Sequence, residues 1–137
     1  MEIVIDSNIL FSALIKDSIT RKMIIEYNDL FLFPDYIFVE INNHLDELLD
    51  KSEMDKQDFQ MLLEIILRKV QVVPSKVLTR YKKQALRIIK DVDPDDVLFI
   101  ACALAYPKVV IWSDDKKLKK QSRIKVLNTK EVIDLFD

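Results

Sequence analysis

Two short apolar segments of the chain each stop on acidic residues. Residues 3–5 (Ile-Val-Ile) are followed by Asp6, and residues 109–112 (Val-Val-Ile-Trp) are followed by Ser113, Asp114 and Asp115. Short runs rich in β-branched residues are typical of buried parallel strands. In an open parallel sheet, ligands bind just beyond the carboxyl ends of the strands. If the two strands are neighbours, their carboxylates therefore share one crevice.

Two further acids can reach the same crevice. Asp96 precedes an apolar helix predicted over residues 97–106, and Glu40 lies nearly two turns into a helix that follows the second strand. Two helical segments separate the third and fourth strands, so one of them can return and bring Asp96 to this edge. Four carboxylates in one notch repel each other unless a cation compensates their charge. Mg²⁺ or Mn²⁺ prefers oxygen ligands, and such an ion activates water for phosphodiester hydrolysis.

The rest of the chain alternates between strands and helices. We expect strands at residues 3–5, 30–33, 70–73, 109–112 and 125–127, and helices at residues 9–15, 18–27, 35–50, 56–69, 75–90, 97–106, just after 115, and from 128 to the end. The expected N-caps are Ser7 or Asn8, Ser18, Asp55, Asp93 and Asn128. This alternation predicts the α/β class, with a parallel five-stranded sheet covered on both faces. We find no linker or repeat, so residues 1–137 are expected to form a single domain.

Composition removes several function classes. The chain has no glycine at all, which excludes a Walker loop, a dinucleotide-binding fingerprint and a glycine nucleophile elbow. It has one cysteine and no signal-peptide pattern, which suits a cytoplasmic protein. The longest apolar run, residues 97–105, is too short to span a bilayer, so no membrane association is expected.

Charge is unevenly distributed although the net charge is only -2. Residues 40–58 contain seven acids and two lysines, whereas residues 76–90 contain six basic residues and no acid. Residues 116–125 are again rich in lysine and arginine. The two basic segments can form an anion-binding rim, or they can simply be solvated helix faces.

Four segments, taken in order, resemble the motifs of the PIN domains, a family of metal-dependent nucleases that includes the toxins of VapBC-type toxin–antitoxin pairs. They are Asp6-Ser7-Asn8-Ile9-Leu10, Pro34-Asp35-Tyr36-Ile37-Phe38-Val39-Glu40, Asp95-Asp96-Val97-Leu98-Phe99-Ile100-Ala101-Cys102-Ala103 and Trp112-Ser113-Asp114-Asp115-Lys116-Lys117-Leu118. Each motif is weak alone, but the four occur in the expected strand and helix context and cover nearly the whole chain. The resemblance implies a three-layer α/β/α fold with the parallel sheet in the middle.

The resemblance also implies the site and the activity. Asp6, Glu40, Asp96 and Asp115 would surround Mg²⁺ or Mn²⁺ and catalyse hydrolysis of RNA, with Ser7, Asn8 and Ser113 supporting them by hydrogen bonds. Additional acids stand beside two of these positions, namely Asp93, Asp95 and Asp114, so the ligand of each cluster is left open. An antitoxin protein and a second copy of the chain are the partners that the resemblance implies.

Other interpretations compete with this one. The chain can be a non-catalytic RNA-binding or protein-interaction module on the same fold. A haloacid-dehalogenase phosphatase also has an aspartate at a strand end, but it needs a second aspartate where Asn8 stands, and a response-regulator receiver needs an early acid pair that Glu2 and Asp6 match poorly. Asp6 can also be no more than a helix cap. His44 lies one turn after Glu40 on the same face, so it can contact the site or the substrate, but we expect it to be an exposed histidine. Cys102 and Trp112 are expected in the core.

Overall fold

The described residues of this computed structural model, 2–16, 18–27, 31–89 and 96–136, form a five-stranded parallel sheet. The strands are β1 (Ile3–Ile5), β2 (Phe31–Pro34), β3 (Val70–Val73), β4 (Val110–Trp112) and β5 (Val126–Leu127), in the order β3-β2-β1-β4-β5. Every neighbouring pair is parallel. The chain first adds β2 and β3 on one side of β1 and then β4 and β5 on the other. The sheet therefore reverses its direction of growth between β1 and β4, which is where ligands bind in such sheets.

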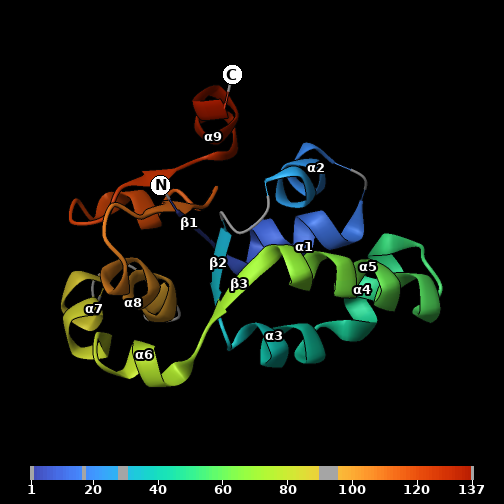
Figure 1. The fold of residues 1–137 in the computed structure, drawn as a ribbon, viewed down its shortest axis with the longest axis horizontal. Coiled ribbons are helices and arrows are strands. Elements are labelled where there is room, and N and C mark those ends of the chain that lie inside the picture. Colours follow the sequence, from blue (N-terminus) through green and yellow to red (C-terminus); the bar gives the residue numbers. More distant parts are fainter. Residues whose placement is uncertain (1, 17, 28–30, 90–95, 137) are drawn as a thin grey trace.

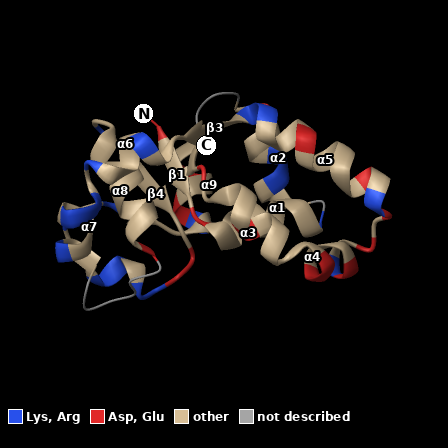
Figure 2. Cartoon of the chain, turned by 90° about the horizontal axis from the view of Figure 1, so that it is seen from below, with Lys and Arg blue, Asp and Glu red and all other residues tan. Residues whose placement is uncertain are grey.

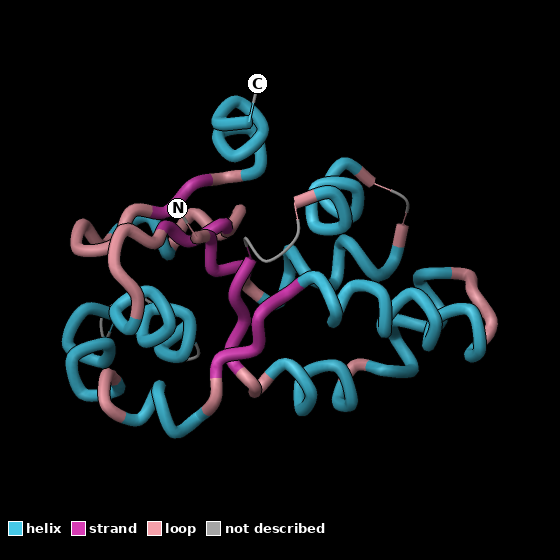
Figure 3. Tube along the Cα trace, in the orientation of Figure 1, coloured by secondary structure: helices cyan, strands magenta, loops and turns pink. Residues whose placement is uncertain are grey.

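Helices cover the sheet in two groups, as Figures 1 and 3 show. One group contains α6 (Ser75–Thr79), α7 (Lys82–Ile89) and α8 (Val97–Ala105), and the other contains α1 (Ser7–Ile15), α2 (Ile19–Glu26), α3 (Ile37–Asn43), α4 (Leu45–Ser52) and α5 (Lys56–Lys69). The short 3₁₀ helix η2 (Leu118–Lys120) and α9 (Thr129–Phe136) complete the described elements. The prediction of a three-layer α/β/α fold is confirmed.

The core follows the sequence pattern. All three residues of β1 are fully buried, as expected for a strand with helices on both faces. In α8, Phe99 to Ala103 are buried without interruption, and the helix contacts β1, β2 and β4. Trp112 is buried beside Phe31, with 5.9 Å between ring centroids. The expectation that α8 is central and that Trp112 packs in the core is therefore confirmed.

Several helix ends differ from the prediction. The helix expected over residues 35–50 is interrupted at His44, which separates α3 from α4, and the one expected over 75–90 is interrupted at Arg80 and Tyr81. The apolar spacing continues across both interruptions, so the pattern does not reveal them. The first helix is capped by Asp6 and not by Ser7 or Asn8. The expected cap at Asp93 lies outside the described residues.

Among the residues that the structure describes, two adopt the left-handed conformation that glycine usually occupies. They are Glu53, at the C-terminal end of α4, and Lys108, just before β4, with φ angles of 57° and 58°. A chain without glycine must place side chains at such positions, at some cost in stability.

None of the described helices combines the length and the apolar character that a membrane crossing requires.

Candidate active site

A cavity of about 410 Å³ opens beside the carboxyl ends of β1 and β4. Five acids from the described part of the chain line it, and four of them are the predicted ones, from four separate segments: Asp6 after β1, Glu40 in α3, Asp96 at the start of α8, and Asp115 after β4. The remaining lining residues are Ser7, Asn8, Phe11, Ser12, Ile15, His44, Glu47, Leu48, Lys51 and Phe99. The fold thus brings the four predicted acids, together with Ser7 and Asn8, to one place.

Asp6 is the most enclosed of these acids, with 6% of its surface exposed. Its Oδ1 accepts a hydrogen bond from the backbone N–H of Ile9 at 2.9 Å, which caps α1. Its Oδ2 accepts a hydrogen bond from the hydroxyl of Ser113. Burial raises the pKa of Asp6; the two hydrogen bonds oppose this shift, and the nearby charges of Asp114 and Asp115 add to it. The carboxylate is therefore held in place but its charge is poorly compensated.

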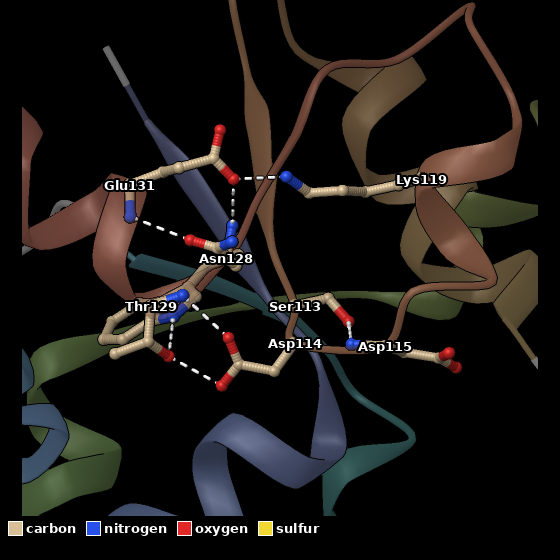
Figure 4. A network of polar contacts seen from close by, with 8 residues as sticks. Ser113, Asp114, Asp115, Lys119, Asn128, Thr129 and Glu131 are labelled. Carbon is tan, nitrogen blue, oxygen red and sulfur yellow. Dashed lines mark hydrogen bonds and ion pairs between the residues drawn. The ribbon is translucent and has the colours of Figure 1, made fainter.

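Ser113 connects the two strand ends. It is 1% exposed, and its hydroxyl both donates to Asp6 and accepts from the backbone N–H of Asp115 at 3.1 Å. The Oδ1 of Asp115 accepts from the backbone N–H of Lys117 at 2.9 Å, which starts the turn into η2. One buried serine thereby sets the separation of the two acids, as Figure 4 shows for the β4 side.

Asp114 does not line the cavity, although it is adjacent to Asp115. Its two oxygens accept hydrogen bonds from the backbone N–H and the hydroxyl of Thr129, each at 2.7 Å, at the first turn of α9 (Figure 4). Asp35, just after β2, forms the same pair of bonds with the N–H and hydroxyl of Ser75 at the start of α6, at 2.9 and 2.7 Å. Asp114 and Asp35 thus each stand at the end of one strand and bond the helix that follows the neighbouring strand.

Glu40 and Asp96 enter the cavity from helices. The side chain of Glu40 is 24% exposed, and its Oε2 lies 3.6 Å from Nε2 of His44. Asp96 occupies the N-cap position of α8. Asp93 and Asp95, the other acids of that cluster, lie outside the described residues.

One wall of the cavity is a run of residues along α3 and α4 of which the sequence indicated only Glu40 and, as an alternative, His44. His44, Glu47 and Lys51 follow Glu40, and they form a chain of contacts: Nδ1 of His44 lies 3.2 Å from Oε2 of Glu47, and Nζ of Lys51 donates to Oε1 of Glu47 at 2.7 Å. The side chain of His44 is 44% exposed, but the structure favours the alternative that it contacts the site, because it lines the cavity and contacts both glutamates. The spacing of residues 40, 44, 47 and 51 on one helical face is the signal that could have indicated this wall.

The four predicted acids offer oxygen atoms, the type of ligand that Mg²⁺ and Mn²⁺ prefer. The hydroxyl of Ser7 is buried and has no hydrogen-bond partner among the residues that the structure describes, so it is free to bond a ligand or water. Within those same residues, no three His, Cys, Asp or Glu side chains lie close enough together to enclose a metal ion as they stand. The acids therefore fit such an ion in chemistry and in location, and side-chain rotations would have to bring them onto it.

Comparison with known proteins identifies the family. No curated protein matches the chain. The structure is similar to a chain in the crystal structure of VapBC2 from Rickettsia felis bound to a DNA fragment from their promoter, with a TM-score of 0.67, 17% sequence identity, and coverage of 93% of this chain and 98% of that chain. This likeness shows the fold. A family model described as "PIN domain" matches residues 4–133, nearly the whole sequence. The chain therefore belongs to the PIN domain family.

Proposed function

We propose that this PIN domain is an endoribonuclease that uses Mg²⁺ or Mn²⁺ to hydrolyse RNA phosphodiester bonds. The observation that carries the proposal is the convergence of Asp6, Glu40, Asp96 and Asp115 on one cavity at the switch point of the sheet. PIN domains are generally divalent-metal nucleases, which agrees with this donor set. We propose further that residues 1–137 form a single nuclease domain, because one buried core joins elements from β1 to α9.

The four acids would hold the ion, and the other residues of the cavity would position them. When bound, the ion would polarise the phosphate and favour the deprotonation of water. Ser113 holds Asp6 and the backbone of Asp115 in one arrangement. Ser7 and Asn8, at the first turn of α1, line the cavity where they could bond a phosphate oxygen or a water. Asp114 would support the site indirectly, by fixing α9 next to β4.

Two basic segments would guide the RNA backbone. Lys116, Lys117, Lys119 and Lys120 closely follow the cavity residue Asp115 and are exposed, and α7, which packs on α8, carries the exposed residues Lys82, Lys83 and Arg87. Figure 2 shows this separation of charge, with blue segments on α7 and red segments on α4. Binding that depends on contacts with phosphates weakens as the salt concentration rises. We therefore expect the affinity for RNA to fall steeply between about 50 and 200 mM salt.

The test is cleavage of a generic single-stranded RNA with Mn²⁺, comparing the wild type with Asp6→Asn and with Asp35→Asn. Asp35 is the matched control, because it also follows a strand and binds a helix start but does not line the cavity. We expect cleavage by the wild type and by Asp35→Asn, its loss in Asp6→Asn, and its loss with EDTA. Equal activity in all three proteins would rule out the mechanism.

The same fold supports a more specific role. The structurally similar R. felis chain comes from a VapBC complex, and we propose that this chain is likewise a toxin that binds an antitoxin protein and forms a homodimer in the cytoplasm. Expression of the chain alone, and with any small reading frame found upstream of its gene, tests this role. Relief of growth inhibition and co-purification are expected, whereas a chain that is harmless alone and binds no such product is not a toxin.

A non-catalytic RNA-binding or protein-interaction module is the second candidate. The observation that favours it is the lack of a ready-made ligand cluster among the described residues. Calorimetry with Mn²⁺ separates the two functions. Binding that Asp6→Asn abolishes supports the nuclease, whereas a folded wild type that binds no Mn²⁺ supports the module.

A further inference from the structure

The cavity has two ends with different chemistry. Asp6, Asp96 and Asp115 lie at the inner end, beside the strand termini, whereas Phe11, Ile15, His44 and Leu48 line an outer end that also contains the charged residues Glu47 and Lys51. Phe11 lies about 7 Å along α1 from Asp6, given the rise of an α-helix. The α1 helix and the α3–α4 pair extend from the sheet in the same direction (Figures 1 and 2), so the outer end continues directly from the acids.

Two aromatic rings face each other in this outer end. The rings of Phe11 and His44 have centroids 5.3 Å apart and are tilted by 54°. Phe11 packs against the core, and the side chain of His44 is 44% exposed. Both nitrogens of His44 are engaged, one 3.6 Å from Glu40 and the other 3.2 Å from Glu47. Because ring nitrogens form contacts in the plane of the ring, these contacts hold the imidazole by its edge. Phe11 lies against one side of the imidazole, and a base would stack on the side toward the cavity that both residues line.

The charged residues around these rings determine which part of a nucleotide can stack on them. Glu40 and Glu47 flank His44, and Lys51 is already bonded to Glu47. A phosphate placed on His44 would be repelled by two carboxylates, whereas a neutral base would not. Bases of single-stranded nucleic acid stack on aromatic side chains, and every base has a face that can do so.

We infer that Phe11 and His44 form a stacking platform for one base of the RNA, that of a nucleotide adjoining the phosphate held at the acids. The inference rests on the proposed nuclease function and adds a base-binding subsite to it. Neither residue belongs to the four acidic positions. The platform would contribute binding energy to the substrate without taking part in the reaction.

Binding of short RNA oligonucleotides that each lack one base tests this platform. The probe is a fluorescein-labelled ten-nucleotide oligouridylate, with an abasic residue moved along its length, measured by anisotropy with Ca²⁺ in place of Mn²⁺. Cleavage with Mn²⁺ then tells which bond is cut and places the abasic position relative to it. The wild type is expected to bind one abasic oligonucleotide about 5- to 100-fold more weakly than the intact strand.

Variants then assign that penalty to the two rings. His44→Ala and Phe11→Leu should bind the intact strand as weakly as the wild type binds the abasic one, so the penalty disappears in them. His44→Phe keeps the ring without the nitrogens, and it should retain the penalty. Phe38→Leu is the matched control for Phe11→Leu, because Phe38 is 53% exposed and lies outside the cavity lining; it should bind as the wild type does.

The outcomes separate this inference from the proposed function. A flat abasic scan with intact metal-dependent cleavage overturns the platform and leaves the nuclease in place. Another outcome is a wild type that binds RNA without cutting it. If one abasic position then weakens its binding, and the same position has no effect in His44→Ala, the platform is supported and the nuclease is ruled out. If His44→Phe loses the penalty as His44→Ala does, a ring face is not what the base contacts, and the platform is again overturned.

Discussion

The cavity has two walls that are built differently. The strand wall consists of Asp6, Ser113 and Asp115, which follow adjacent parallel strands and are linked by buried hydrogen bonds through one serine. The helix wall consists of Glu40, His44, Glu47 and Lys51, which follow one another along α3 and α4 through partly exposed contacts, the one between Glu47 and Lys51 being an ion pair.

The difference shows which contacts fix the positions of the side chains in this site. In the strand wall, sheet register sets the backbone positions, and burial strengthens the hydrogen bonds that orient the side chains. In the helix wall, half-exposed ion pairs contribute little to stability and are screened by salt. We therefore expect changes in the strand wall to affect catalysis strongly, and changes in the helix wall to affect substrate binding moderately.

The largest effect is expected for Asp6→Asn. Loss of this acid should reduce cleavage by at least about 100-fold, more than the loss of a residue that only supports a metal ligand. Without metal, the same change should raise the melting temperature at pH 7, because burial beside Asp114 and Asp115 disfavours the charge of Asp6. An amide can still accept from Ile9, so the cap of α1 is retained. Thermal unfolding in EDTA checks this, and a lower melting temperature would show that the carboxylate is stabilising.

A smaller loss is expected for Ser113→Ala, which breaks the link within the strand wall. Cleavage should fall about 10- to 100-fold, and stability should fall by about 1 to 3 kcal/mol because Asp6 and the N–H of Asp115 lose a partner. Ser113→Thr keeps the hydroxyl and is the control. If alanine and threonine behave alike in the cleavage assay, the hydroxyl does not position the acids.

The adjacent pair Asp114 and Asp115 should separate stability from catalysis. Asp114→Ala removes both bonds to Thr129 and should cost about 0.5 to 2 kcal/mol, as the loss of a helix cap does, with most of the activity retained. Asp115→Ala should remove activity with a smaller change in stability. Urea unfolding and cleavage assays on both variants check this, and the reverse assignment would mean that Asp114 is the acid that the reaction needs.

The smallest effect is expected for Glu47→Gln in the helix wall. Bonds from Lys51 and then His44 lower the pKa of Glu47. A group whose pKa is lower in the folded state stabilises the protein above its unfolded pKa, and this stabilisation is lost as pH falls through the folded value. The wild type should therefore be slightly more stable than the variant at pH 7, and the two should converge in acid and in high salt. Melting temperatures over a pH series check this, and a difference that persists in acid would exclude the ion pair as its cause.

The two walls also differ in how many of their residues could be predicted from the sequence. Asp6 and the pair Asp114 and Asp115 could be placed at one edge because they follow runs of buried β-branched residues, and parallel strands align such ends. The sequence does not tell Asp114 from Asp115, because Asp114 turns toward α9 by bonding Thr129, a contact that depends on the pairing of β5 with β4.

Most residues of the helix wall could not be predicted from the sequence, for a different reason. The apolar spacing of residues 37, 41, 45 and 48 runs through His44 without a break, whereas the helix axis changes there. Which polar residues then line the cavity depends on how α4 packs against α1, a long-range contact that no local pattern encodes. Local patterns therefore predicted the elements and the strand-end acids, and tertiary packing decided the rest of the lining.

The strand order has a consequence for how the protein is made. β1 precedes β2, β3, β4 and β5 in the sequence, yet it lies between β2 and β4, and Ser113 bonds to Asp6 across 107 positions of sequence. On the ribosome, β1, β2 and β3 can pair while the strand wall of the cavity is still absent. The strand wall is completed only after β4 has emerged, so a nascent chain would acquire part of its core before the proposed active site could form.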